Sequence, residues 1–216
     1  MSRLLRTWAW YLERLGLSTY KRQLVFYYRP PAEAAPPPRI PPGAEIRFVR
    51  PGELESIGYP GGWLSLAEAR EWLERGDSDC LAVIRGGKIA AYMWAERKTA
   101  RIDFLRLRIP LPAGHVYYSK VLVTPEHRRH GLARAMYQYL AHVEPRLAAH
   151  SACVAENLPM HRLFLGSGWQ PSALLDVYKL GPLKVYRLER TTEGGPRRAI
   201  RSSIGSEDLF GGSARV

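Results

Sequence analysis

The residues with the clearest chemical potential lie between Val121 and Ala135, where an apolar run meets a basic, glycine-containing turn and then an amphipathic segment. A strand that passes through such a turn into a helix presents unpaired backbone N–H groups, which bind anions. Gly131 lets a ligand approach the main chain closely, and Arg128 and Arg129 add charge to the positive end of the helix. The stretch therefore predicts a site for a phosphate or pyrophosphate, although a surface turn with solvated arginines would show the same residues.

The helix that follows is indicated by apolar residues spaced three or four positions apart, a spacing that places them on one face. These residues are Leu132, Met136, Leu140, Val143 and Leu147. We expect the helix to begin near Arg129. A P-loop is excluded because the pattern Gly-x-x-x-x-Gly-Lys-Ser/Thr does not occur in the sequence. A Rossmann turn is not expected because the turn between Val121 and Ala135 has no Gly-x-Gly.

The pattern from Val123 to Ala133, with Pro125, Arg128 and Gly131 at its key positions, resembles the acyl-CoA-binding motif of the GNAT (Gcn5-related N-acetyltransferase) superfamily. The core of that motif is Arg/Gln-x-x-Gly-x-Gly/Ala. The resemblance implies that the strand pairs with the pantetheine arm of acetyl-CoA or another acyl-CoA and that the turn holds the pyrophosphate. The implied cosubstrate-binding residues are Val121, Leu122, Val123, Arg128, Arg129, His130, Gly131, Leu132, Ala133 and Arg134.

A second resemblance begins at Asn157, which is followed after six residues by Phe164 and then by Gly168 and Trp169. It is similar to the Asn-x(6)-Tyr-x-x-x-Gly-Phe segment of the same superfamily, so Asn157 and Phe164 join the implied acyl-CoA site. The family tyrosine commonly protonates the departing thiolate. Phe164 has no proton to give, and the acid is therefore unassigned.

The reaction that the resemblance implies is direct attack of a neutral amine on the thioester, which requires a base and an acid but no nucleophilic cysteine. Each candidate for these roles also has a plainer role as a packing residue or a solvated charge, and water can carry the amine proton instead. The candidate acids are Tyr117, Tyr118, Ser119 and Tyr178, and the candidate bases are Glu96, Asp103 and His115.

The elements that must position these residues follow from periodicity and turn signals. The order is strand, two helices, three strands, helix, strand, helix and two strands, which predicts an α/β arrangement with a mixed sheet. Ser65 with Glu68 fits a helix-capping box, and Gly86-Gly87 predicts a hairpin. The resemblance further implies an α+β, GNAT-like, mostly antiparallel central sheet flanked by helices. The loop at residues 58–63 is a candidate border of a substrate pocket.

Three regions are predicted along the chain. Residues 1–43 form an N-terminal extension with an amphipathic helix at 2–17, a strand-like segment at 23–28 and a proline-rich linker. Residues 44–189 form the GNAT-like acyltransferase domain. Residues 190–216, rich in Gly, Ser and Arg, are expected to be a flexible basic tail.

Composition bounds the partners. The 216 residues carry a formal charge of +12, which predicts attraction to CoA phosphates, an acidic acyl carrier protein, nucleic acid or an anionic membrane surface. The arginines match no nucleic-acid motif, so specific nucleic-acid binding is not expected.

Cys80 and Cys153 read as reduced core thiols and the histidines show no ligand spacing, so we expect no metal site. The sequence shows no signal-peptide pattern and no apolar span long enough to cross a bilayer, so we expect a cytoplasmic protein. The N-terminal helix is a candidate for contact with a membrane surface or a partner, or it packs on its own domain or on the second subunit of a homodimer.

Three functional hypotheses stay open at this stage. The first is acetyl transfer from acetyl-CoA to an unknown primary amine. The second is transfer of a longer acyl chain, from acyl-CoA or an acyl carrier protein, near a membrane. The third is a non-catalytic module that senses acyl-CoA or binds nucleic acid.

Overall fold

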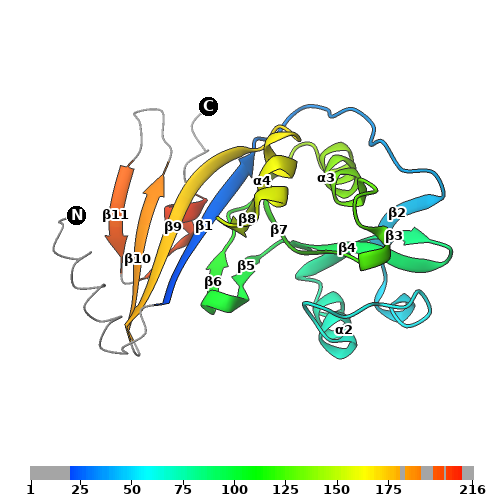
Figure 1. The fold of residues 1–216 in the computed structure, drawn as a ribbon, viewed down its shortest axis with the longest axis horizontal. Coiled ribbons are helices and arrows are strands. Elements are labelled where there is room, and N and C mark those ends of the chain that lie inside the picture. The colour runs from blue at the N-terminus through cyan, green and yellow to red at the C-terminus, as the bar shows by residue number, and fades with distance from the viewer. Residues whose placement is uncertain (1–19, 181–182, 191–196, 202, 211–216) are drawn as a thin grey trace.

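The computed structural model describes residues 20–180, 183–190, 197–201 and 203–210 (Figure 1). The strands are β1 (Tyr20–Arg29), β2 (Ala44–Val49), β3 (Ser78–Arg85), β4 (Lys88–Glu96), β5 (Thr99–Ile102), β6 (Leu107–Pro110), β7 (His115–Val123), β8 (Ala148–Val154), β9 (Gln170–Leu180), β10 (Leu183–Arg190) and β11 (Arg197–Arg201). The α-helices are α2 (Leu66–Glu74), α3 (Leu132–Val143), α4 (Leu158–Leu165) and α5 (Ser206–Leu209). Three 3₁₀ turns are η1 (Pro51–Glu53), η2 (Asp103–Leu105) and η3 (Pro125–His127).

Nine of these strands form one sheet in the order β11-β10-β9-β1-β8-β7-β4-β3-β2, and β5 and β6 form a separate hairpin. Neighbouring strands pair antiparallel except β7 and β8, which are parallel. The connection between those two strands contains α3, as a parallel crossover requires. The predicted mixed, mostly antiparallel sheet flanked by helices is confirmed.

The helices lie on both faces of this sheet. In Figure 1, α3 and α4 lie above the sheet, and α2 and the β5–β6 hairpin lie below it. The upper layer encloses a buried cluster that includes Met136, Tyr137 and Phe164. Below the sheet, one cluster packs around Trp94 near α2, and another packs around Ile109 of the hairpin. Apolar residues on alternate positions of the strands supply both faces.

Local signals in the sequence placed several element ends correctly. Ser65 caps α2, where its Oγ accepts the N–H of Glu68 while the Glu68 carboxylate accepts the Ser65 N–H at 2.8 Å. The β3–β4 turn holds Gly86 and Gly87 at φ of 56° and 75°, a conformation that glycine adopts without steric cost. The α3 helix begins at Leu132, three residues later than expected, because Gly131 at its N-cap is left-handed.

The strand-like segment that the sequence analysis assigned to an N-terminal extension has a different place. It is β1, which pairs with β8 on one side and β9 on the other. Phe26 is 1% exposed, which identifies this strand as core rather than as an appended segment. Pairing partners more than 100 residues away carry no local signal, which is why the proline-rich stretch was read as a domain boundary. The predicted helix at residues 2–17 lies outside the described residues.

The predicted flexible tail also differs from the structure. β11 extends the sheet beside β10, and α5 follows. Leu209 and Phe210 are 4% and 1% exposed, and Phe210 contacts the rings of Tyr117 and His150. Leu209 and Phe210 therefore belong to the buried cluster around Ile109, against which Ile204 also packs.

The position of β1 inside the sheet generates a stability prediction. Phe26→Ala should lower the free energy of unfolding by about 3–5 kcal/mol, because it leaves a cavity in the core. Glu33→Ala, in the exposed stretch after β1, is the matched control and should change it little. Urea denaturation measures both, and a Phe26→Ala variant as stable as the parent would contradict the core position of β1.

Candidate acyl-transfer site

The site is built around the point at which β7 and β8 part. Their parallel pairing runs from His115 opposite Ala148 to Tyr118 opposite Ser151, and it stops there. Beyond that row β7 continues to Val123 and β8 to Val154 without pairing to each other. The two strand ends therefore diverge and leave the facing main-chain groups open to a ligand.

Main-chain direction decides which residues of β7 face this divergence. The Thr124 N–H donates to Ala90 O at 3.0 Å, and Leu122 pairs with Tyr92, so these residues direct their backbone groups toward β4. Because the groups alternate along a strand, those of Val121 and Val123 face the opening. Of the three strand residues implied to hold pantetheine, Leu122 thus directs its backbone N–H and C=O groups toward β4 and away from the opening. Its side chain packs beside α2 instead.

The β7 carbonyls that face the opening accept hydrogen bonds from two side chains. Trp63 Nε1 donates to Val121 O at 3.2 Å, and Arg128 Nε donates to Val123 O at 3.3 Å. The loop that carries Trp63, at residues 58–63, lies against β7, and a Cβ on Gly62 would come within 2.5 Å of Leu122 Cδ1. The sequence had marked this loop as a candidate border of a pocket, and the structure places it beside the opening.

The basic turn lies beyond the end of β7. Arg129 and Gly131 both take left-handed φ angles, of 67° and 75°, and no side chain caps α3. The first helical hydrogen bond runs from Ala135 N to Gly131 O, which leaves the N–H groups of the first turn directed outward. A cavity of about 320 Å³ opens at this end. It is lined by Arg39, Ile40, Pro41, His130, Gly131, Arg134, Ala135 and Gln138.

Arg39 reaches this cavity from the proline-rich segment. That segment runs along α3, where Gln138 Oε1 accepts the Arg39 N–H at 3.3 Å and His142 Nδ1 donates to Ala35 O at 3.0 Å. Arg39 and Arg134 together make the cavity cationic. Sequence reasoning missed Arg39, since a proline-rich run carries no sign of the helix on which it lies.

The second motif divides into two different positions. Asn157 caps α4 through its Oδ1, which accepts the Met160 N–H, and so stands just beyond the end of β8. Phe164 is 0% exposed and stacks on Tyr27, with ring centroids 4.5 Å apart. The Phe164 ring is therefore enclosed by the core and does not line the opening, contrary to its implied binding role.

A β-bulge marks the apex of the opening on the other side of β7. Ser119 pairs with Trp94 and Leu122 with Tyr92, so β7 has one residue more than β4 between these pairs. Lys120 takes a left-handed φ of 51° in the bulge. The bulge turns Ser119 and Lys120 toward the last residue of β4, Glu96.

Glu96 is a buried carboxylate, and its side chain is 0% exposed. It accepts hydrogen bonds from Ser119 Oγ and from the Arg101 N–H, the latter at 2.7 Å. Burial raises the pKa of Glu96 to about 7, against the opposing effects of Lys120 and these hydrogen bonds. A carboxylate with a pKa near neutrality is suited to take and release a proton.

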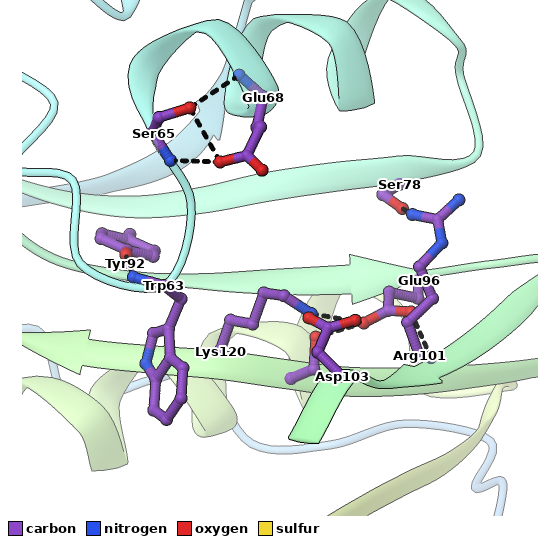
Figure 2. A network of polar contacts seen from close by, with 10 residues as sticks. Trp63, Ser65, Glu68, Ser78, Tyr92, Glu96, Arg101, Asp103 and Lys120 are labelled. Atoms are coloured by element: carbon purple, nitrogen blue, oxygen red, sulfur yellow. Dashed lines mark hydrogen bonds and ion pairs between the residues drawn. The ribbon is translucent and has the colours of Figure 1, made fainter. Parts of the chain in front are cut away.

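Figure 2 shows the charges that surround Glu96. Lys120 Nζ lies 2.8 Å from Asp103 Oδ2 and 3.7 Å from Glu96 Oε1, and its side chain is 5% exposed. Lys120 Nζ and the Arg101 guanidinium both lie over the ring of Trp72, at 4.5 and 4.2 Å from its centroid, as cation–π contacts. Of these residues the sequence analysis named only Glu96 and Asp103, because a lysine within a strand reads as a surface charge.

The other candidate acids and bases are less favourably placed. Tyr118 Oη donates to Glu144 Oε2 at 3.4 Å, and the Tyr117 ring lies against Phe210 in the cluster that contains Ile109. His115 stands at the opposite end of β7, where its Nδ1 lies 2.8 Å from His150 Nε2. Tyr178 is on β9, which β1 and β8 separate from β7. Ser119, Glu96 and Asp103 are the candidates that the fold brings together.

Within the described residues, no group of three or more His, Cys, Asp or Glu side chains could hold a metal ion. None of their helices has the length and apolar character needed to cross a membrane. Cys80 and Cys153 are free and buried, as the sequence analysis predicted.

Comparison with known proteins decides the family. The family model described as "Acetyltransferase (GNAT) family" matches residues 50–169, which is more than half of the chain. The chain belongs to the GNAT family. The matched range contains β7, the basic turn, α3, β8 and α4. No curated protein sequence matches the chain.

Solved structures support the GNAT fold at low sequence identity. A Drosophila protein is 20% identical, with a TM-score of 0.54 over 83% of this chain and 57% of its own. A GCN5-related N-acetyltransferase from Sphaerobacter thermophilus is 18% identical, with a TM-score of 0.56 over 81% of this chain and 55% of its own. The chain thus spans less than two thirds of the length of these GNAT-like structures.

The burial of Glu96 generates a prediction about stability. Its pKa is about 7 in the folded protein and 4.5 in a solvated carboxyl, so its favourable effect on folding is complete below pH 4.5 and is lost as the pH rises through 7. Glu96→Gln does not titrate. The unfolding free energy of this variant minus that of the parent should rise by about 2–3 kcal/mol between pH 5 and 8. Urea denaturation across this range measures it, and a difference that stays constant would contradict the raised pKa.

Proposed function

We propose that this protein is an acyl-CoA-dependent N-acyltransferase that transfers acetyl from acetyl-CoA to a primary amine by direct attack. The observation that carries the proposal is the opening between β7 and β8, which continues into the uncapped N-terminus of α3. The opening offers backbone groups to an extended polar arm, and the helix end and its arginines suit phosphates. Family membership supports the same donor.

The donor occupies the two parts of this groove in a fixed order. The pyrophosphate binds at Gly131 and the N–H groups of the first turn of α3, with Arg39 and Arg134 beside it. The pantetheine arm runs back along Val121 and Val123, where it replaces the contacts of Trp63 and Arg128 with their carbonyls. The thioester then lies at the apex, next to Ser119.

The base is Glu96, and Ser119 connects it to the acceptor. Glu96 is fully buried, whereas Ser119 is partly exposed and donates its hydroxyl proton to the carboxylate. As the amine nitrogen attacks the thioester carbon, the amine proton passes to Ser119 Oγ and the Ser119 proton passes to Glu96. The amine approaches from the α2 face, where Lys120 and Asp103 lie.

The donor assignment is tested by thiol release from acetyl-CoA over a panel of amines that includes amino acids, polyamines, aminosugars and peptides. The parent should release CoA with at least one amine, and Gly131→Glu should abolish the release because a carboxylate repels the pyrophosphate. The matched control is Gly87→Glu, since Gly87 shares the φ of 75° and lies in the β3–β4 turn. It carries the same backbone strain and charge but should retain activity.

Two results would contradict the proposal. The first is a parent that releases no CoA with any amine, which would favour a non-catalytic module. The second is equal acetyl-CoA affinity of Gly131→Glu and the parent, measured by calorimetry, which would remove the turn from the donor site.

The role of Glu96 is tested by the pH dependence of the rate. With an acceptor that stays uncharged throughout, such as a hydrazide, kcat/KM of the parent should rise with pH through about 7, because the carboxylate form is the active one. Glu96→Gln should lower kcat/KM by about 10²–10⁴-fold and remove this dependence. Asp103→Asn is the control, since Asp103 contacts the same Lys120 Nζ. Loss of the pH dependence in Asp103→Asn instead would assign the base to Asp103.

A further inference from the structure

A hydrogen-bonded pair that the proposed mechanism leaves unused joins β1 to α4. Tyr27 Oη lies 2.6 Å from His161 Nδ1, and His161 Nε2 lies 3.0 Å from Ala155 O. A carbonyl only accepts, so Nε2 carries a hydrogen and donates it. The Ala155 carbonyl thereby orients the imidazole with Nδ1 directed at the tyrosine hydroxyl.

This pair stands at the apex of the opening. Tyr27 pairs with Ser151, the same residue that forms the last row of β7–β8 pairing with Tyr118. Cys153 belongs to the diverging part of β8, and its Sγ lies 3.6 Å from His161 Nδ1. Tyr27 Oη and Cys153 Sγ are therefore both within 4 Å of the same ring nitrogen of His161.

The pair and the base lie on opposite faces of the sheet. Tyr27 packs in the cluster beneath α3 and α4, whereas Glu96 faces Trp72 of α2 through Lys120 and Arg101. A thioester at the apex lies between the two groups. Attack from the α2 face then directs the leaving sulfur toward the face that carries Tyr27.

Phe164 has no proton to give to the sulfur, and Cys153 is not suited to hold the acyl group. Phe164 stacks on Tyr27 but carries no hydroxyl. Burial raises the pKa of Cys153 to about 11, which keeps the thiol neutral and makes it a poor nucleophile, so an acyl-cysteine intermediate is not favoured. Burial also raises the pKa of Tyr27, which keeps its proton in place at neutral pH.

We propose that Tyr27 is the acid that protonates the CoA thiolate and that His161 is the residue that positions its hydroxyl. The assignment rests on the proposed acyl-CoA transfer. When the tetrahedral intermediate collapses, the C–S bond breaks and its electron pair goes to sulfur, which takes the proton of Tyr27 Oη. His161, whose Nε2 donates to Ala155 O, holds the Tyr27 hydroxyl in place through Nδ1. Solvent, which accepts the amine proton from Glu96 after the reaction, returns a proton to Tyr27 Oη.

The test compares two acyl donors whose leaving thiolates differ in basicity, so that only the more basic thiolate needs a proton from the protein. Tyr27→Phe should lower kcat with acetyl-CoA by about 10²-fold with little change in KM, the range expected for loss of a general acid. With an acetyl thioester of 4-nitrothiophenol, whose thiolate leaves unaided, the variant should match the parent. Tyr28→Phe removes a hydroxyl from the neighbouring position of β1 and should leave both donors unaffected.

A swap of the stacked pair provides the second variant. In Tyr27→Phe with Phe164→Tyr the volume is conserved, so folding should be retained, and the hydroxyl is returned to the adjacent ring. Because the Phe164 ring is enclosed by the core, this double variant should fold like the parent but regain no activity with acetyl-CoA. His161→Leu should show the same loss as Tyr27→Phe, confined to acetyl-CoA, and His161→Asn, which keeps a hydrogen-bonding group near the Nδ1 position, should restore part of the activity.

The outcomes separate this inference from the proposed function. A parent that releases CoA, together with a Tyr27→Phe variant that is fully active or loses the same factor with both donors, would overturn the role of Tyr27 alone. A parent that releases no CoA with any amine would instead overturn the proposed function on which that role depends.

Discussion

The end of pairing between β7 and β8 at Tyr118 and Ser151 is the constraint on which the rest of the site depends. A parallel pair needs a long crossover, and here the crossover is the basic turn and α3, so the N-terminus of α3 must follow the opening directly. The same row of pairing includes Tyr27 of β1. One interruption of a hydrogen-bond ladder thus exposes main-chain acceptors, directs a helix N-terminus and aligns groups from three strands.

The bulge at Lys120 adds the second requirement, which is a buried charge close to this opening. Glu96 is desolvated, yet it stands near two cations and accepts two hydrogen bonds, so neither its charged nor its neutral form is strongly favoured at neutral pH. Trp72 carries Lys120 and Arg101 on its ring, and Asp103 takes up the charge of Lys120. The network keeps a buried ionisable group available without leaving it unpaired.

The upper and lower layers of the sheet divide the chemistry between them. The uncapped N-terminus of α3 and the Tyr27–His161 pair belong to the side of α3 and α4, whereas Glu96, Lys120 and the Trp63 loop belong to the side of α2. Neither layer alone contains a complete set of groups for amide formation from a thioester. The sheet is what holds both sets at one point.

The sequence by itself determined the local elements and the donor motif. Capping at Ser65 and Asn157, the Gly86–Gly87 turn and the strand, turn and helix around Gly131 depend on residues a few positions apart, and such patterns can be read directly. Only the tertiary structure decided that β1 is a central strand, that Phe164 is enclosed, that Arg39 lines the cavity at the N-terminus of α3 and that Tyr27 meets His161. These contacts join residues separated by roughly 100 positions or more, or depend on which face of a strand a side chain takes. Their energy comes from pairing and burial that exist only after the sheet has closed around them.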